Sequence, residues 1–142
     1  MLVGVNAYFL AHPHTGSGQY LAELARRLPR LRPDWEFRWY APAGLRVPEV
    51  GLPQPLGVPV GALPGHWGKL YFEQIAFPAQ ARRDGCDAVF VPYFGPPSRF
   101  QERAVVTVHD TIPLLLPAYR RGPLARAYGD LVRANAGKCR LL

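Results

Sequence analysis

Several kinds of residue are scarce in this chain. It has only two cysteines, Cys86 and Cys139, too few for a disulfide framework or a zinc ribbon, so a reduced, cytoplasmic location is expected. No uncharged apolar run approaches the roughly 18 residues that cross a bilayer. The opening residues 1–9 carry neither a basic region nor a small-residue cleavage site. We therefore expect no membrane span and no signal peptide.

Proline, glycine and arginine are abundant instead. Sixteen prolines and 14 glycines among 142 residues predict short elements joined by many turns. Hydrophobic residues make up 49% of the chain, enough for a core, and residues 1–142 have the length of one domain. The 17 basic residues, 15 of them arginine, exceed the 10 acidic ones and give a net charge of +7. Such a balance suggests an anionic membrane or nucleic acid as partner, but no nucleic acid is expected because no nucleic-acid-binding motif is present.

Short apolar or aromatic runs alternate with segments of helical periodicity. Strands are expected at four such runs, residues 2–10, 35–40, 87–91 and 104–108. Helices are expected in three segments, from near Ser17 to just before Pro29, over residues 66–83 and over residues 123–136. Pro78 kinks or splits the second helix, which carries Leu70, Tyr71, Gln74 and Ile75 on one side. No strand is expected after the third.

Residues 42–64 hold six prolines and four glycines, and this density predicts a long surface loop with extended pieces. Outside that loop the strands alternate mostly with helices, and three of them lack polar alternation. This pattern favours an α/β fold with a doubly wound, mainly parallel, Rossmann-like sheet. In such sheets ligands bind beyond the carboxyl ends of the strands. Two places are therefore candidates for chemistry, residues 10–19 and residues 109–113.

The first candidate is the glycine loop Gly16, Ser17, Gly18 and Gln19 before the first helix. Glycines let backbone N–H groups approach a ligand closely, and a helix N-terminus favours a phosphate. The loop does not complete the G-x-G-x-x-G fingerprint, because Leu21 occupies the third position, and it lacks the Gly-Lys-Ser/Thr of a P-loop. The alternative interpretation is an ordinary glycine-rich turn with Ser17 as the helix cap.

The second candidate is the pair His109 and Asp110, which follows a predicted buried strand. Histidine can act as acid or base near neutral pH and can donate to a sugar hydroxyl or a phosphate. The alternative is that His109 satisfies backbone groups while Asp110 caps a turn. The other histidines have no metal-ligand spacing, so no metal is expected. No G-x-S-x-G nucleophile elbow exists, and Cys86 is expected to be a small buried hydrophobe.

Taken together, these segments resemble the N-terminal, acceptor-side domain of family-4 glycosyltransferases of the GT-B fold. The resemblance rests on four segments that span most of residues 2–120 in the order of that family. They are Thr15-Gly-Ser-Gly-Gln-Tyr20, Tyr71-Phe-Glu-Gln-Ile-Ala-Phe-Pro78, Cys86-Asp-Ala-Val-Phe-Val-Pro-Tyr93 and Val105-Val-Thr-Val-His-Asp-Thr-Ile-Pro113.

The resemblance implies transfer of a sugar from a nucleotide-sugar donor to a sugar or lipid-linked acceptor, with retention and without a cofactor or metal. It places residues 16–19 at the donor diphosphate and His109 with Asp110 near the reacting centre. It places Tyr93 and Phe94 on the acceptor side. The C-terminal half of that fold, with its Glu-x7-Glu pair, is absent from the sequence, so the chain is expected to be a single GT-B half that is inactive alone.

The positive charge is concentrated near the end of the chain. Residues 120–142 contain six basic residues and one acidic residue, which gives +5 of the total +7. A second hypothesis is therefore a non-catalytic module that binds anions or an anionic membrane, peripheral to its inner face, through this basic segment. The simpler interpretation of the segment is a solvated helix face. A third hypothesis is a nucleotide-binding α/β protein of other chemistry.

Overall fold

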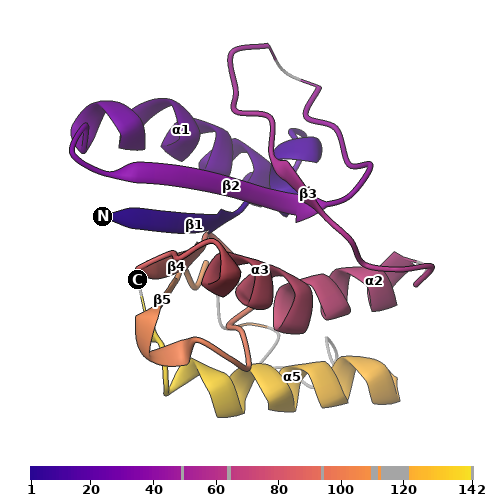
Figure 1. Ribbon diagram of the computed structural model, residues 1–142. Helices are drawn as coiled ribbons and strands as arrows, with labels where there is room; N and C mark the ends of the chain where they lie inside the picture. Colours follow the sequence, from indigo (N-terminus) through magenta and orange to yellow (C-terminus); the bar gives the residue numbers. More distant parts are fainter. Residues whose placement is uncertain (49, 64, 94, 110–111, 113–121, 142) are drawn as a thin grey trace.

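The computed structural model describes residues 1–48, 50–63, 65–93, 95–109, 112 and 122–141. Six strands form one sheet in which every neighbouring pair is parallel. The strands are β1 (Leu2–Asn6), β2 (Glu36–Pro42), β3 (Leu56–Val58), β4 (Ala88–Val91), β5 (Ala104–Val106) and β6 (Arg140–Leu141). Their spatial order is β3-β2-β1-β4-β5-β6. This is the order of a doubly wound, Rossmann-like α/β fold, and the predicted fold class is confirmed (Figure 1).

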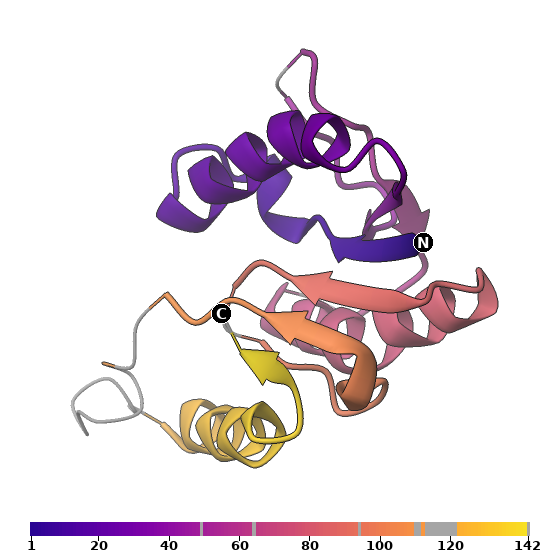
Figure 2. The same cartoon turned by 90° about the vertical axis from the view of Figure 1, so that its left-hand side faces the viewer.

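Helices connect the strands. They are η1 (Tyr8–Ala11), α1 (Gly16–Leu31), α2 (Gly65–Tyr71), the π-helical segment η2 (Phe72–Ala76), α3 (Phe77–Arg83), η3 (Gln101–Arg103) and α5 (Pro123–Ala136). In both views α1 lies at one end of the molecule and α5 at the other (Figures 1 and 2). No helix among the described residues is long and apolar enough to cross a membrane.

Each face of the sheet has its own core. Leu21 and Ala25 of α1 pack against Val3 and Val5 of β1, while Phe72 and Phe77 lie in the core on the opposite face. Alternate residues of a strand point to opposite faces, so both faces of β1 and β4 are covered. Burying each large apolar side chain contributes about 1.5–3 kcal/mol, which is why these strands contain few polar residues.

Two strands lie where none was predicted. The three residues of β3 fall inside the predicted loop 42–64 and pair with residues 40–42 of β2. The two residues of β6 follow α5 and pair with β5, so the expectation of no strand after residue 136 is wrong. Segments of two or three residues are too short to show a period, and neighbouring strands rather than local sequence create them.

The first strand ends at Asn6, and the prediction that it continues to residue 10 is wrong, because residues 8–11 form the 3-10 helix η1. The helix boundaries also differ from those predicted. Helix α1 begins at Gly16 and continues through Pro29 to Leu31. Proline in the last turn removes one helical hydrogen bond without preventing the turn. The predicted helix 66–83 is split as expected, and the irregular part is the π-helical segment just before Pro78. Pro78 has no N–H with which to bond the carbonyl four residues earlier, so the regular hydrogen-bond ladder is interrupted there.

Candidate functional site at the carboxyl edge

The carboxyl ends of β1 and β4 define the point where the strand order reverses. From β1 the chain proceeds to β2 and β3 and then crosses to β4 on the other side of β1. In open α/β sheets the crevice at such a switch point is the usual place for a ligand. The glycine loop and the N-terminus of α1 follow β1, while Tyr93 follows β4 and His109 follows β5. The predicted site residues that the structure describes therefore share this edge.

Thr15, rather than Ser17, caps the glycine-loop helix. Its hydroxyl accepts a hydrogen bond from the N–H of Gly18 at 3.0 Å and donates one to the carbonyl of His12 at 2.8 Å. Its own carbonyl accepts from the N–H of Gln19 at 3.0 Å. The interpretation of Ser17 as the cap is wrong, because the helix begins one residue earlier than predicted. The amides of Gly18 and Gln19 already have partners, so the amides of Gly16 and Ser17 are the better donors for an anion.

The two glycines of the loop differ in what surrounds them. A Cβ atom on Gly18 would lie 2.1 Å from the carbonyl oxygen of His12, closer than any real contact. Glycine at this position is therefore explained by the tight packing of α1 against the preceding turn. A Cβ atom on Gly16 would meet nothing within 4 Å. Of the two predicted donor-binding glycines, Gly16 is the one whose surroundings leave room for a ligand.

His109 lies beside the first turns of α1, although the two are far apart in sequence. Its ring meets the ring of Tyr20 edge-to-face, with 4.9 Å between ring centroids. The Tyr20 hydroxyl is 3.3 Å from the hydroxyl of Thr107, which anchors the contact. The Nε2 atom of His109 is 3.0 Å from the carbonyl oxygen of Pro92. A carbonyl can only accept, so Nε2 carries the hydrogen, and Nδ1 of this exposed residue is the ring atom left to accept a hydrogen bond.

Two of the predicted site residues, Asp110 and Phe94, lie outside the residues that the structure describes. Tyr93 is described and is 4% exposed, with its ring edge-to-face against Phe9 at 4.6 Å between centroids. A ring buried to this extent gives an acceptor little surface to contact. The role of Tyr93 in acceptor binding therefore stays a prediction.

A charged pair that the sequence reasoning missed lies at the same edge. Lys69 of α2 pairs with Glu73 of η2, whose side chain is 1% exposed. The ammonium of Lys69 also lies 5.4, 5.7 and 5.1 Å from the ring centroids of Tyr8, Phe9 and Tyr93, within the range of cation–π attraction. Burial and the nearby Glu73 charge raise the pKa of Tyr8.

The spacing of Lys69 and Glu73, four residues apart in a predicted helix, was the available signal for their pairing. Local spacing does not show that three rings from other elements surround the pair. Asn6, at the end of β1, is fully buried, and its amide nitrogen has no hydrogen-bond partner among the described residues. The carboxyl edge thus holds two groups of polar and aromatic side chains, one around Tyr20 and His109 and one around Lys69 and Glu73.

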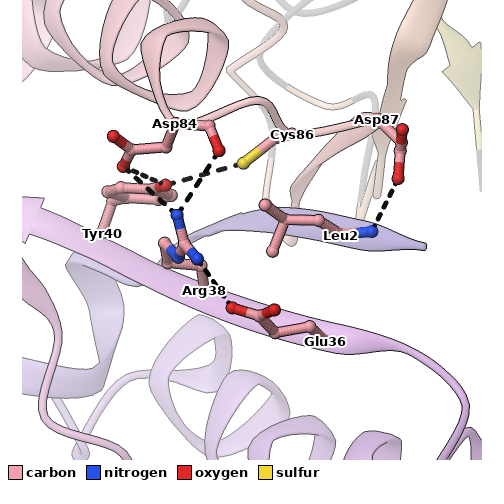
Figure 3. A network of polar contacts seen from close by, with 7 residues as sticks. All are labelled: Leu2, Glu36, Arg38, Tyr40, Asp84, Cys86 and Asp87. Carbon is pink, nitrogen blue, oxygen red and sulfur yellow. Dashed lines mark hydrogen bonds and ion pairs between the residues drawn. The ribbon is translucent and has the colours of Figure 1, made fainter.

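The amino-terminal edge of the sheet is held together by a separate polar network (Figure 3). The hydroxyl of Tyr40 donates to a carboxylate oxygen of Asp84 at 2.7 Å and lies 3.6 Å from the sulfur of Cys86. Burial raises the pKa of the Cys86 thiol, and its prediction as a small buried hydrophobe is confirmed. A cavity of about 540 Å³ beside this network is lined by Arg82, Gly85, Cys86, Asp87 and residues 100–103. It lies at the edge opposite the predicted site.

The basic segment 120–142 is only partly described. Arg120 and Arg121 lie outside the described residues, whereas Arg126, Arg133 and Lys138 are exposed. Helix α5 buries Val132 and Asn135, and the Asn135 side chain accepts a hydrogen bond from Gln101 at 2.8 Å. This packing favours the simpler interpretation of α5 as a helix that covers its own sheet.

The strand order and the residues at the carboxyl edge of the sheet together define this protein as a Rossmann-like α/β domain with a candidate ligand site at the carboxyl ends of its strands. No family model matches the chain, and neither a curated protein nor a solved structure matches it. Among the described residues no group of three or more histidine, cysteine, aspartate or glutamate side chains is placed to hold a metal ion.

Proposed function

We propose that this chain is the acceptor-side domain of a GT-B glycosyltransferase that moves a sugar from a nucleotide-sugar donor to a sugar or lipid-linked acceptor. The observation that carries the proposal is the contact of His109 with Tyr20, which brings a strand-end histidine against the helix that follows the glycine loop. The resemblance of the four sequence segments to this family supports the same conclusion. Retention of configuration and independence of metal belong to the proposal as family expectations.

The chemistry required of this edge is the stabilisation of a diphosphate leaving group. The N–H groups of Gly16 and Ser17, together with the positive end of the α1 dipole, would attract the developing negative charge. The Nδ1 atom of His109 would accept a hydrogen bond from a sugar hydroxyl near the reacting centre. In this proposal a second domain holds the nucleotide, so the chain by itself binds the donor weakly and turns over little or none of it.

Amide chemical shifts of the isotope-labelled chain test the proposal directly. Titration with inorganic pyrophosphate and with a panel of nucleotide sugars should shift the amide signals of Gly16 and Ser17 and the ring signals of His109. The variant Gly16→Ala should weaken these shifts, because it adds a methyl group beside the Gly16 amide in space that is otherwise open. His66→Ala, an exposed histidine on α2, is the matched control for His109→Ala and should leave the titration unchanged.

Three results would contradict the proposal. The first is the absence of any shift at the carboxyl edge with pyrophosphate and with every donor tested. The second is a response confined to the amino-terminal cavity around Arg82 and residues 100–103. The third is efficient sugar transfer by this chain alone, because the proposal assigns nucleotide binding to another domain.

A further inference from the structure

The segments α2, η2 and α3 follow one another as a continuous helical rod (Figure 1). Large apolar side chains are exposed along it. The side chains of Trp67, Tyr71 and Ile75 are 55%, 37% and 47% exposed. They are spaced four residues apart, which places them on one side of the rod. We call these three residues the Trp67–Ile75 face.

The opposite side of the same rod already covers the sheet. Phe72 and Phe77 are fully buried there, and so is most of Ala76. A helix that covers a sheet normally presents polar side chains to water on its other side. Contiguous exposed apolar side chains instead mark an interaction surface. The sequence predicted one common side for Leu70, Tyr71, Gln74 and Ile75. That prediction is wrong, because Gln74 is buried whereas Tyr71 and Ile75 are exposed.

The charges on the rod point to the chemistry of the partner. Residues 65–83 contain one acidic residue, Glu73, and it is buried against Lys69. The exposed charged side chains of the rod are Arg82 and Arg83, in the last turn of α3. The rod thus carries the apolar Trp67–Ile75 face along its length and two cations at its carboxyl end, with no exposed carboxylate among residues 65–83. It complements a surface that is apolar inside and anionic outside.

Two further observations favour a bilayer over a second copy of the chain. The net charge of +7 opposes self-association and favours anionic lipid. Tryptophan and tyrosine, whose rings have an apolar body and a polar end, are the side chains typical of the membrane–water interface. We propose that the Trp67–Ile75 face inserts into the headgroup region of an anionic bilayer, with Arg82 and Arg83 at the lipid phosphates. This inference is independent of glycosyl transfer and uses a different surface from the basic segment 120–142.

Vesicle sedimentation of the whole chain tests the inference. Binding to vesicles of 70% phosphatidylcholine and 30% phosphatidylglycerol should exceed binding to pure phosphatidylcholine and should weaken as the salt concentration rises. Trp67→Ser and Ile75→Ser should each weaken binding about tenfold, because each removes one large apolar side chain from the lipid. Leu31→Ser is the matched control, since Leu31 is 70% exposed at the end of α1 and should have no effect.

Two further variants separate the apolar contribution from the charge. The double variant Arg82→Gln with Arg83→Gln should remove most of the salt dependence while leaving the fold intact. Lipid binding should shift tryptophan fluorescence to shorter wavelength, and Trp67→Phe should abolish that shift. Lipid binding unaffected by Trp67→Ser and Ile75→Ser would overturn the inference. So would the absence of binding to anionic vesicles, or a dimer that Trp67→Ser disrupts.

Discussion

Replacement of Gly18 by alanine should destabilise this fold, whereas the same replacement at Gly16, two residues earlier, should not. The new Cβ atom at position 18 would lie 2.1 Å from the carbonyl oxygen of His12 and 3.0 Å from that of Phe9. Both neighbours are backbone atoms, so no side-chain rotation can relieve the contact. The helix and the preceding turn must separate, and the cap made by Thr15 is strained with them.

The magnitude follows from known costs of overpacking. Inserting a methyl group into a filled space costs about 1–3 kcal/mol, and a backbone clash belongs to the upper part of that range. Alanine recovers at most about 1 kcal/mol through its higher helix propensity. We therefore expect Gly18→Ala to lower the free energy of unfolding by about 2 kcal/mol, equivalent to a fall in Tm of about 6–8 °C for a domain of this size. Gly16→Ala should leave it unchanged or raise it by about 0.5 kcal/mol.

Urea unfolding followed by circular dichroism measures both variants in the same buffer. Equal midpoints for Gly16→Ala and Gly18→Ala would refute the reasoning, because the structure predicts opposite surroundings for the two positions. The same pair of variants separates stability from binding. Gly16→Ala should weaken the pyrophosphate response described above while the unfolding midpoint stays constant.

Three further predictions concern other parts of the fold. Lys69→Met should lower the free energy of unfolding in urea by about 3 kcal/mol, because it leaves the carboxylate of Glu73 buried without its cation; a loss below about 1 kcal/mol would contradict this. Burial and the hydrogen bond to Asp84 raise the pKa of Tyr40. The neutral hydroxyl of Tyr40 therefore stabilises the folded state, and this contribution is complete below pH ~10 and is lost as the pH rises above it. Unfolding measured from pH 8 to 11 should therefore depend less on pH in Tyr40→Phe, and an equal dependence would exclude this cause. Pro29→Ala should raise Tm by about 3–6 °C by restoring a hydrogen bond in the last turn of α1, and calorimetry showing a lower Tm would assign Pro29 a packing role.

Much of the fold could be predicted because its signals are local. The apolar runs that became β1, β4 and β5 have few polar residues, as buried parallel strands require. The three- and four-residue spacing of Leu21 and Ala25 identified the buried side of α1. Their order along the chain was enough to predict a parallel sheet and to select its carboxyl edge as the candidate site.

The candidate site was predicted less completely. The glycine loop and His109 were identified, but nothing local indicated that Tyr20 would join them or that Gly18 is required by packing. The charged pair of Lys69 and Glu73 was missed for a similar reason. A lysine and a glutamate four residues apart are common on exposed helix surfaces, and only their aromatic surroundings distinguish this pair.

The sequence by itself determined the fold class, because the spacing of hydrophobic residues and the positions of turn residues are properties of short stretches of chain. The tertiary structure alone decided which side chains meet. Tyr20 and Thr107 are 87 residues apart and come together only because β1, β4 and β5 lie side by side in the sheet. Likewise, only packing decided that Phe72 faces the core while Tyr71 and Ile75 face outward. The helix containing them is apolar on both sides, so its own period could not indicate which side the sheet would cover.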